Sequence, residues 1–417
     1  MLRVSVDELK PGMVLARPIP LPDQPRRVLL ARNFKISEAM IPKLREAGIS
    51  TVWIRFQGME FLESVIDEEL QQQQRQVYST VRHNFERMMG GAEPDLDFPE
   101  FSKGVSELFE YLKGSPSGTV MLEKLDAFDN YLMSHTVNVC YLALLLGMKL
   151  EDYLIQERRA VEASQAKDLQ ELGLGCLLHD VGKMQVPRAI LDKPNRLTEE
   201  ERDEMRRHPA YGYAMVRDQV SAPVAQIVLN HHQRWDGNGY PRPSDRRTGQ
   251  PLEPLAGNRI PVLCRMTTPA DVYDAATSAR IYSPPKPPVQ VLHEMRTVCR
   301  GSFDPVVEKA FFEIVPPFPI ASLVTLSTGD QAVVVEHNRH DSCRPRVKLL
   351  RDPSGALYAG DRRQEIDLSA YPELHVTHWG GHDVRPFLFS SDRTTPVPWP
   401  GRQSADESSA LAGNRFA

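Results

Sequence analysis

The pattern of apolar and polar residues changes character along the chain. Up to residue 58, short apolar pieces alternate with turn signals such as Lys10-Pro11-Gly12. Within this part, residues 37–48 have apolar positions at helical spacing followed by a glycine, and the run at 51–54 has the composition of a strand. These features predict a small α+β domain over residues 1–58.

The middle of the chain has the periodicity of helices. Residues 59–116 are polar and glutamine-rich with a break at Gly90-Gly91, and we interpret them as a helical connector. A charged stretch at 150–167 either lengthens the neighbouring helices or bulges outward. The apolar segments that predict a helical core within residues 117–312 are 138–147, 169–179, 222–232 and 266–278.

After Pro316-Pro317 the periodicity changes from helix to strand. Three apolar runs separated by glycine-containing turns predict a small β extension over residues 313–385. The composition of residues 386–417, rich in serine, proline, arginine and glycine, predicts a disordered tail. The expected fold class is therefore mainly α, with a helical core flanked by an N-terminal α+β domain and a C-terminal β extension.

Composition narrows the class of partner and compartment. The formal net charge is −5, from 50 basic and 55 acidic residues, so we expect no broad surface for a nucleic-acid polymer. The five cysteines are widely spaced without a CxxC pair, which is typical of reduced thiols. The N-terminus is charged where a signal peptide is apolar, and the longest apolar candidate, 139–148, is too short for a membrane helix. We expect a cytoplasmic protein that does not bind membranes.

Five of the twelve histidines fall between positions 135 and 232, where two dense motifs occur. The first is HDVGK at residues 179–183, and the second is HHQRWDGNGYP at residues 231–241. A neutral imidazole is a good metal ligand near pH 7, and an adjacent aspartate supplies oxygens that can bridge two ions. The groups that could form one metal site are His135, His179, Asp180, His208, His231, His232 and Asp271.

The isolated members of this set also have ordinary structural explanations. His135 alone could be a hydrogen-bonded core residue, His208 a helix cap, and Asp271 an ion-pair partner. Seven such groups around two dense motifs favour metal binding, because a core does not need so many polar side chains at helix ends. We interpret the remaining histidines as structural or surface residues: His83, His293, His337, His340, His375, His378 and His382.

Two ions about 3.5–4 Å apart suit phosphoester hydrolysis. One ion lowers the pKa of a shared water, and both neutralise phosphoryl oxygens as charge develops. Lys183 follows His179 by about one helical turn, which would place its ammonium near a non-bridging phosphate oxygen. The pattern therefore indicates a metal-dependent hydrolase in which Asp180 and Lys183 are the candidate catalytic residues.

In these motifs the sequence resembles the HD-GYP family, bacterial phosphodiesterases of cyclic di-GMP within the HD superfamily. The resemblance covers about residues 119–310 and rests on the ordered motifs HxxxV at His135, HDVGK at His179, HP at His208, HH…DGNGYP at His231 and DVYDA…R at Asp271. It implies an HD-type helical bundle that hydrolyses cyclic di-GMP to pGpG or GMP. The first 58 residues are similar to a small domain that often precedes this core, and the β segment to a C-terminal extension.

The family's functional residues can be carried over onto the matching positions. The seven groups named above would be the metal ligands, with Asp180 bridging two divalent ions, and iron or manganese is the expected metal. For Arg280, a solvated helix end remains an alternative to substrate contact. The implied substrate-contacting residues are Lys183, Gly239, Tyr240, Pro241, Asp274 and Arg280.

The sequence departs from the family at three positions. Tyr131 stands where three-metal members carry a glutamate, which favours two ions. Gln233 stands where HHE is usual; an amide lends less basicity to a neighbouring ligand, so Gln233→Glu is expected to be equally active or faster. Ser283 stands where family members often carry a basic residue directly after the Arg-x-Tyr step, and its presence would weaken the binding of the second phosphate.

Three functions therefore compete. The leading hypothesis is a cyclic di-GMP phosphodiesterase. The second is an HD phosphohydrolase that acts on another nucleotide, which the GYP loop disfavours, and the third is a sensor or interaction protein with little turnover, which Gln233 and Ser283 favour. Cyclic di-GMP is the expected partner. Signalling proteins that dock on the N-terminal domain or the GYP loop are further candidates, and homodimer formation is an open alternative.

Overall fold

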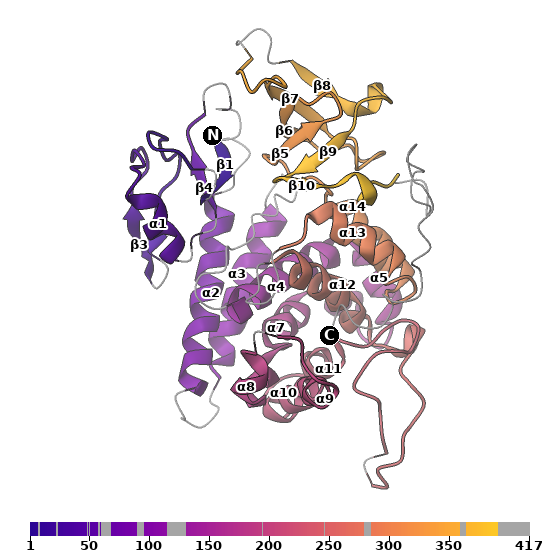
Figure 1. Ribbon diagram of the computed structural model, residues 1–417. Coiled ribbons are helices and arrows are strands. Elements are labelled where there is room, and N and C mark those ends of the chain that lie inside the picture. The colour runs from indigo at the N-terminus through magenta and orange to yellow at the C-terminus, as the bar shows by residue number, and fades with distance from the viewer. Residues whose placement is uncertain are drawn as a thin grey trace.

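The computed structural model describes the chain up to residue 390, except for residues 7–8, 22–23, 48, 50, 57–58, 60–67, 90–95, 115–130, 194, 246, 279–284 and 359–363. Its described elements form an N-terminal unit, a helical body and a C-terminal sheet (Figure 1). The body carries the predicted metal-site residues. The predicted class, mainly α with β structure at both flanks, is confirmed.

The N-terminal unit contains two short antiparallel pairs of strands and one helix. β1 (Leu2–Ser5) pairs with β4 (Thr51–Ile54), and β2 (Ile19–Leu21) pairs with β3 (Gln24–Leu30). The single helix is α1 (Met40–Glu46), which lies within the predicted helical segment. Strand β4 covers the predicted run 51–54.

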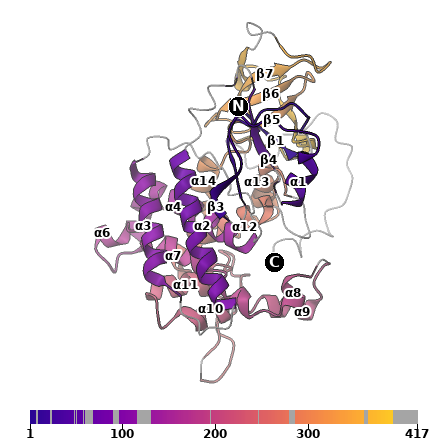
Figure 2. The same cartoon turned by 90° about the vertical axis from the view of Figure 1, so that its left-hand side faces the viewer.

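The helical body is built around the long apolar helix α4, which packs against α7 and α12. In the view of Figure 2, α2 and α3 lie side by side along this body. The elements, in chain order, are α2 (Glu68–Met89), α3 (Phe98–Gly114), α4 (Tyr131–Lys149), α5 (Glu151–Glu157), α6 (Ala163–Ala166), α7 (Gln170–Leu178), η3 (Val181–Gln185), α8 (Arg188–Leu191), α9 (Glu199–Met205), α10 (His208–Val216), α11 (Ala222–Asn230), η4 (Gly257–Arg259), α12 (Val262–Thr277), α13 (Pro288–Thr297) and α14 (Pro305–Ile314).

The segment that we interpreted as a connector belongs to the core of this body. Phe85 in α2 and Phe101 in α3 are buried in the same hydrophobic cluster as the core of α4 and α7. Close packing is visible at Gly173 of α7, where an added Cβ would lie 2.4 Å from Cγ1 of Val105. Helices α2 and α3 therefore support the body directly, and do more than join two units.

Helix α4 is longer than the apolar segment 139–148 suggested. Its 18-residue window Leu132–Lys149 has the length and composition of a membrane-crossing helix, but 78% of it is buried inside the protein. Such burial is what the central helix of a bundle requires, because neighbouring helices cover it on all sides. Next in the chain, the charged stretch 150–167 forms the separate short helices α5 and α6, so it does not lengthen the neighbouring helices.

The C-terminal sheet is antiparallel with the strand order β10-β9-β5-β6-β7-β8. Ile320, Val333 and Leu350 from this region share a hydrophobic cluster with Leu15 and Ile54 of the N-terminal unit, so the two flanking units pack on each other. The elements are β5 (Leu323–Leu326), β6 (Gln331–Glu336), β7 (Arg346–Arg351), β8 (Glu365–Asp367), η6 (Leu368–Ala370), β9 (Val376–Trp379), β10 (His382–Asp383) and η7 (Arg385–Phe387).

The predicted tail over 386–417 begins too early. Phe389 is buried, its backbone N–H donates to Sγ of Cys343 at 3.4 Å, and its ring lies 4.3 Å from the guanidinium of Arg296. Aromatic burial of this kind fixes the chain there, which a composition rich in serine and proline did not indicate. Residues 391–417 lie outside the described part of the chain.

Candidate metal centre

Helix ends bring the predicted ligands together inside the helical body. His135 lies within α4, His179 and Asp180 end α7, and His208 begins α10; the remaining ligands are His231 and His232 at the end of α11 and Asp271 in α12. The approach of η3 to α10 depends on Gly182, because an added Cβ would lie 1.9 Å from the carbonyl oxygen of His208. This glycine therefore lets the HDVGK motif and the HP motif meet.

The carboxylate of Asp180 faces two groups of imidazoles with its two oxygens. Oδ2 lies 3.7 Å from Nε2 of His135 and 3.5 Å from Nε2 of His179. Oδ1 lies 3.2 Å from Nε2 of His208 and 3.9 Å from Nε2 of His231. Asp180 is thus the residue that both halves of the cluster share.

Asp271 makes the corresponding contacts from the opposite side. Its Oδ1 lies 3.1 Å from Nε2 of His135 and 3.9 Å from Nε2 of His179, and its Oδ2 lies 3.6 Å from Nδ1 of His232. All seven predicted ligand residues therefore lie in one cluster. Three sets have ligand atoms within 4.8 Å of one another: Asp180 with His208, His231 and His232; His135 with His179 and Asp180; and His179 with His231 and Asp271.

Backbone carbonyls set the orientation of three imidazoles. Nδ1 of His179 donates to the carbonyl oxygen of Cys176 at 2.7 Å, and Nδ1 of His208 and of His231 donate in the same way to the carbonyls three residues earlier, at 2.8 and 3.0 Å. With the proton on Nδ1, each Nε2 keeps a lone pair directed at the cluster. The fold thus directs these three ring nitrogens into the cluster.

Two buried atoms in the cluster lack the partner that burial requires. Nε2 of His179 and Oδ1 of Asp180 have no hydrogen-bond donor among the described residues. His208 approaches Oδ1, but its proton is on Nδ1, so two lone pairs face each other there. Orphaned buried acceptors cost free energy unless something satisfies them. A cation among these acceptors would do so, and nitrogen and carboxylate donors suit a divalent transition metal.

The protonation states also suit metal binding. Burial lowers the pKa of His179, and burial with repulsion from neighbouring histidines lowers that of His231 well below its usual value. Burial likewise lowers the pKa of His232 to about 3. Although burial opposes it, the Lys183 ammonium and the histidines hold the pKa of Asp180 well below its usual value. Neutral imidazoles and an ionised carboxylate are the forms that bind metal ions.

His135 differs because carboxylates surround it. Burial lowers its pKa, but hydrogen bonds with Asp271 and Asp274 outweigh this effect and raise the pKa to about 9. Nδ1 of His135 lies 2.8 Å from Oδ2 of Asp274. Asp274 is fully buried; its Oδ1 accepts from Nδ2 of Asn138 at 3.1 Å, and its Oδ2 accepts from the Ser278 hydroxyl. Asp274 therefore orients His135 from behind. The expected contact between Asp274 and substrate does not fit this position.

Lys183 lies at the edge of the cluster. Its Nζ is 2.5 Å from Oδ2 of Asp180, and its side chain is 21% exposed. The lysine therefore stands between the buried carboxylate and solvent. An anion that enters from this side would meet the ammonium, as the sequence predicted for a phosphate.

The signature loop, residues 236–256, contains the DGNGYP motif and folds back onto the end of α11. Tyr240 donates its backbone N–H to the carbonyl oxygen of His232 at 3.2 Å, and the two rings stack with centroids 4.5 Å apart. An added Cβ at Gly239 would lie 2.4 Å from the backbone nitrogen of Arg234, so only glycine permits this approach. Gly239, Tyr240 and Pro241 therefore lie directly over a predicted metal ligand.

Gln233 connects this loop to the ligand helix. Its side chain is buried, and its Nε2 donates to the carbonyl oxygen of Pro241 at 2.7 Å. The hydrogen bond goes to the loop and reaches no imidazole. The sequence-based expectation that Gln233 sets the basicity of a ligand is therefore replaced by a structural one, in which Gln233 fixes the loop.

Other predicted positions fall outside the described residues. Arg280 and Ser283 lie in the segment 279–284, and the side chain of Tyr131 is likewise not described. Their predicted roles stay predictions. One neighbour that sequence reasoning missed is Arg206, whose guanidinium lies 6.0 Å from the centre of the Tyr240 ring. Its place two residues before His208 was the available signal.

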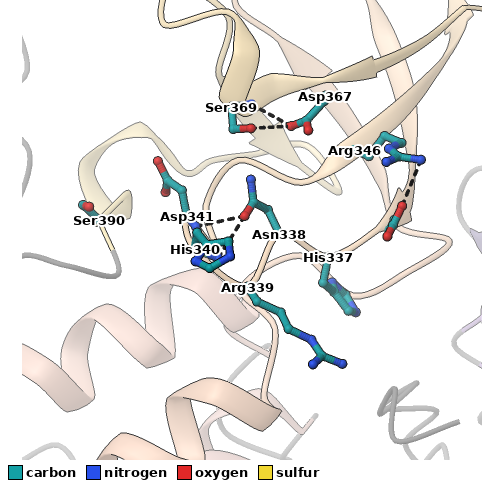
Figure 3. Close-up of a pocket in the computed structure, with 10 residues that line it drawn as sticks. His337, Asn338, Arg339, His340, Asp341, Arg346, Asp367, Ser369 and Ser390 are labelled. Carbon is teal, nitrogen blue, oxygen red and sulfur yellow. Dashed lines mark hydrogen bonds and ion pairs between the residues drawn. The ribbon is translucent and has the colours of Figure 1, made fainter.

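A separate hollow of about 610 Å³ lies in the C-terminal sheet (Figure 3). Its lining mixes charges of both signs, including Arg339 and Arg346 against Asp341 and Asp367. None of its lining residues belongs to the His/Asp cluster. This hollow is therefore separate from the His/Asp cluster of the helical body.

Two segments match known protein families. Residues 154–307 match the family described as HD domain, and residues 323–379 match the family described as KOW domain associated with HD domain. The first covers the ligands from His179 to Asp271, and the second covers strands β5 to β9. The resemblance that the motifs indicated is confirmed.

Curated relatives carry names of cyclic dinucleotide phosphodiesterases. A cyclic di-GMP phosphodiesterase of Pseudomonas aeruginosa is 37% identical over 259 residues, covering 61% of this chain and 56% of the relative. One from Thermotoga maritima is 34% identical over 34% of this chain and 37% of the relative. A 3'3'-cGAMP-specific phosphodiesterase of Vibrio cholerae is 32% identical over 33% and 24%. The chain thus spans about half or less of these relatives' length.

One solved structure also matches this chain. It is an HDG"Y"P protein from Bdellovibrio bacteriovorus, with a TM-score of 0.44, 16% identity and coverage of 74% of this chain and 97% of that chain.

We predict that Asp180→Ala loses both bound ions, because both halves of the cluster depend on this carboxylate. Metal analysis of the purified variant by mass spectrometry checks the prediction. Asp218→Ala is the control, since Asp218 is an exposed aspartate outside the cluster. Metal content unchanged in Asp180→Ala, or reduced only by half, would contradict the shared position of Asp180.

We predict that Gln233→Glu destabilises the protein, since a carboxylate cannot donate to the Pro241 carbonyl and places two acceptors together. The free energy of unfolding at pH 7 should fall by about 1–3 kcal/mol, the cost of an unsatisfied buried acceptor. Urea denaturation measures this change. The exposed Gln165→Glu, with the same change of charge, should alter it by less than about 0.5 kcal/mol. Equal stability of Gln233→Glu and the wild type would remove the proposed link.

Proposed function

We propose that this chain, whose residues 154–307 match the HD domain family and which carries the HD-GYP motifs, is a metal-dependent phosphodiesterase that hydrolyses cyclic di-GMP. The observation that carries the proposal is the placement of Asp180 between two sets of imidazoles. One shared carboxylate with separate nitrogen donors on each side suits a pair of ions. Two ions suit the hydrolysis of a phosphodiester more than one ion does.

We assign the ligands in two groups that share Asp180. His135, His179, Asp180 and Asp271 would hold one ion; the second would be held by Asp180, His208, His231 and His232. When bound, two divalent ions lower the pKa of a water molecule and neutralise the phosphoryl oxygens as the water attacks. Iron or manganese fits the mixture of imidazoles and carboxylates.

The side chains at the open edge would bind the substrate. The Lys183 ammonium, partly exposed beside Asp180, would hold a non-bridging phosphate oxygen and stabilise its negative charge. Burial together with Asp271 and Asp180 raises the pKa of Tyr240 well above its usual value, so its hydroxyl stays protonated and can donate a hydrogen bond. Arg206 beside Tyr240 adds a second cation for a second phosphate.

The position of Gln233 bears on the choice between an enzyme and a sensor. The sensor hypothesis rested partly on an amide weakening a ligand, but Gln233 contacts Pro241 and no ligand. Its replacement of glutamate therefore gives no reason to expect slow turnover. The relatives named for 3'3'-cGAMP support a second candidate substrate of the same chemical class.

The test of function is turnover by the metal-loaded full chain. We expect the protein to convert cyclic di-GMP to pGpG or GMP. Chromatography of the products measures this conversion, and 3'3'-cGAMP is the competing substrate. Faster turnover of 3'3'-cGAMP would transfer the assignment to that nucleotide. Binding of cyclic di-GMP without turnover by protein that holds its ions would favour the sensor.

We predict that Lys183→Ala lowers kcat for the cyclic dinucleotide by about 10²–10³-fold, the usual effect of removing one group that stabilises transition-state charge. Metal content should stay intact, because imidazoles and carboxylates hold the ions. Lys193→Ala is the control, since this lysine pairs with Glu201 away from the cluster. Unchanged kcat, or loss of metal from Lys183→Ala, would show that Lys183 has a different role.

A further inference from the structure

A second buried charge, outside the metal cluster, lies beneath the signature loop. Arg265 is on α12, 5% exposed, and faces away from the ligands toward α5 and α14. Its Nη1 donates to Oδ2 of Asp304 at 2.6 Å, and its Nη2 donates to Glu157 at the end of α5. A buried guanidinium between two carboxylates is held in one orientation, because each of its two terminal nitrogens donates to a different carboxylate.

Arg265, Glu157, Asp304 and Tyr153 form one buried group, which we call the Arg265 hub. This hub fixes two helices and an aromatic ring. Oδ1 of Asp304 accepts from the backbone N–H of Val306 at 2.9 Å and caps α14, while Oδ2 accepts from Arg265 and from the Tyr153 hydroxyl at 2.7 Å. The Tyr153 ring lies 5.7 Å from the Arg265 guanidinium. Arg265 therefore joins α5, α12 and the start of α14 at one point.

The signature loop begins and ends at the same hub. Trp235 directly precedes the loop residues 236–256, and its ring lies 5.6 Å from the Arg265 guanidinium. The backbone N–H of Trp235 donates to the carbonyl oxygen of Ser302 at 2.8 Å. Where the loop returns, Gly257 donates its N–H to the carbonyl of Trp235 at 2.9 Å, and Oδ1 of Asn258 lies 3.5 Å from Nη1 of Arg265. Both ends of the loop thus meet at one cation.

We propose that Arg265 is a positioning residue that fixes the signature loop over the metal cluster, through Trp235 and Asn258. The loop carries Tyr240, which stacks on His232, so its ends set where the substrate-facing ring lies. The charged stretch 150–167, which contributes no residue to the His/Asp cluster, contributes Glu157 to this anchor. Lysine cannot replace Arg265, because an ammonium lacks the planar fork that reaches both carboxylates and stacks on the rings.

The inference rests on the proposed phosphodiesterase function, and two substrates test it. Bis(p-nitrophenyl) phosphate offers a phosphodiester without any nucleoside, whereas cyclic di-GMP would also contact the loop. We expect Arg265→Lys to raise KM for cyclic di-GMP by about tenfold, the scale of a small misplacement of a binding group. The rate on bis(p-nitrophenyl) phosphate, per metal-loaded protein, should stay within about twofold. Glu157→Gln should show a smaller change of the same kind.

Arg296→Lys is the matched control. Arg296 is also a partly buried arginine between two aromatic rings, at 4.2 Å from Phe312 and 4.3 Å from Phe389, and it contacts none of the described residues of the loop. We expect this variant to change neither substrate's KM. Parallel losses on both substrates in Arg265→Lys and Glu157→Gln would show a general structural role and overturn the proposal. So would an unchanged KM for cyclic di-GMP in both variants.

Proteolysis gives a measure that does not depend on activity. Arg247 is exposed in the loop, so trypsin can cleave after it. We expect cleavage there to be faster in Arg265→Lys than in the wild type or in Arg296→Lys. If the wild type hydrolyses neither substrate, the proposed function fails, and the cleavage rates still decide whether Arg265 anchors the loop. Equal cleavage in the three proteins would overturn the anchor itself.

Discussion

The structure depends on keeping one carboxylate, Asp180, ionised in a buried site between two sets of imidazoles. Such a group is costly to bury unless cations or hydrogen bonds surround it. The fold supplies the Lys183 ammonium at one edge, and the four histidines around the two oxygens present nitrogens that would hold the remaining compensating cations. The close approach at Gly182 follows from the same requirement, since it brings His208 to Oδ1.

Local sequence motifs were sufficient to predict which residues form the His/Asp cluster. The HDVGK and HH motifs place their histidines at the ends of α7 and α11, and the packing of the body brings these ends together with α4, α10 and α12. The seven predicted ligands consequently meet in one cluster. The strands and helices were predictable for the same reason, because the spacing of apolar residues reports on each element locally.

Contacts between distant segments were not predictable in this way. Asp274 orients His135 from 139 positions away, and Gln233 binds a carbonyl of the loop, so neither partner could be identified from residue type alone. Helices α2 and α3 looked like a connector because their exposed faces are polar, yet their buried faces complete the core. Phe389 was likewise not predictable: its buried ring orders the chain there, although the composition of its neighbours predicted disorder.

The central claim is that the cluster holds two ions that share Asp180. Anomalous diffraction from crystals of the wild-type protein, collected above the iron and manganese edges, tests it most directly. We expect two peaks about 3.5–4 Å apart, each within coordination distance of a different Asp180 oxygen. A single peak, or two peaks of which only one is near Asp180, would contradict it.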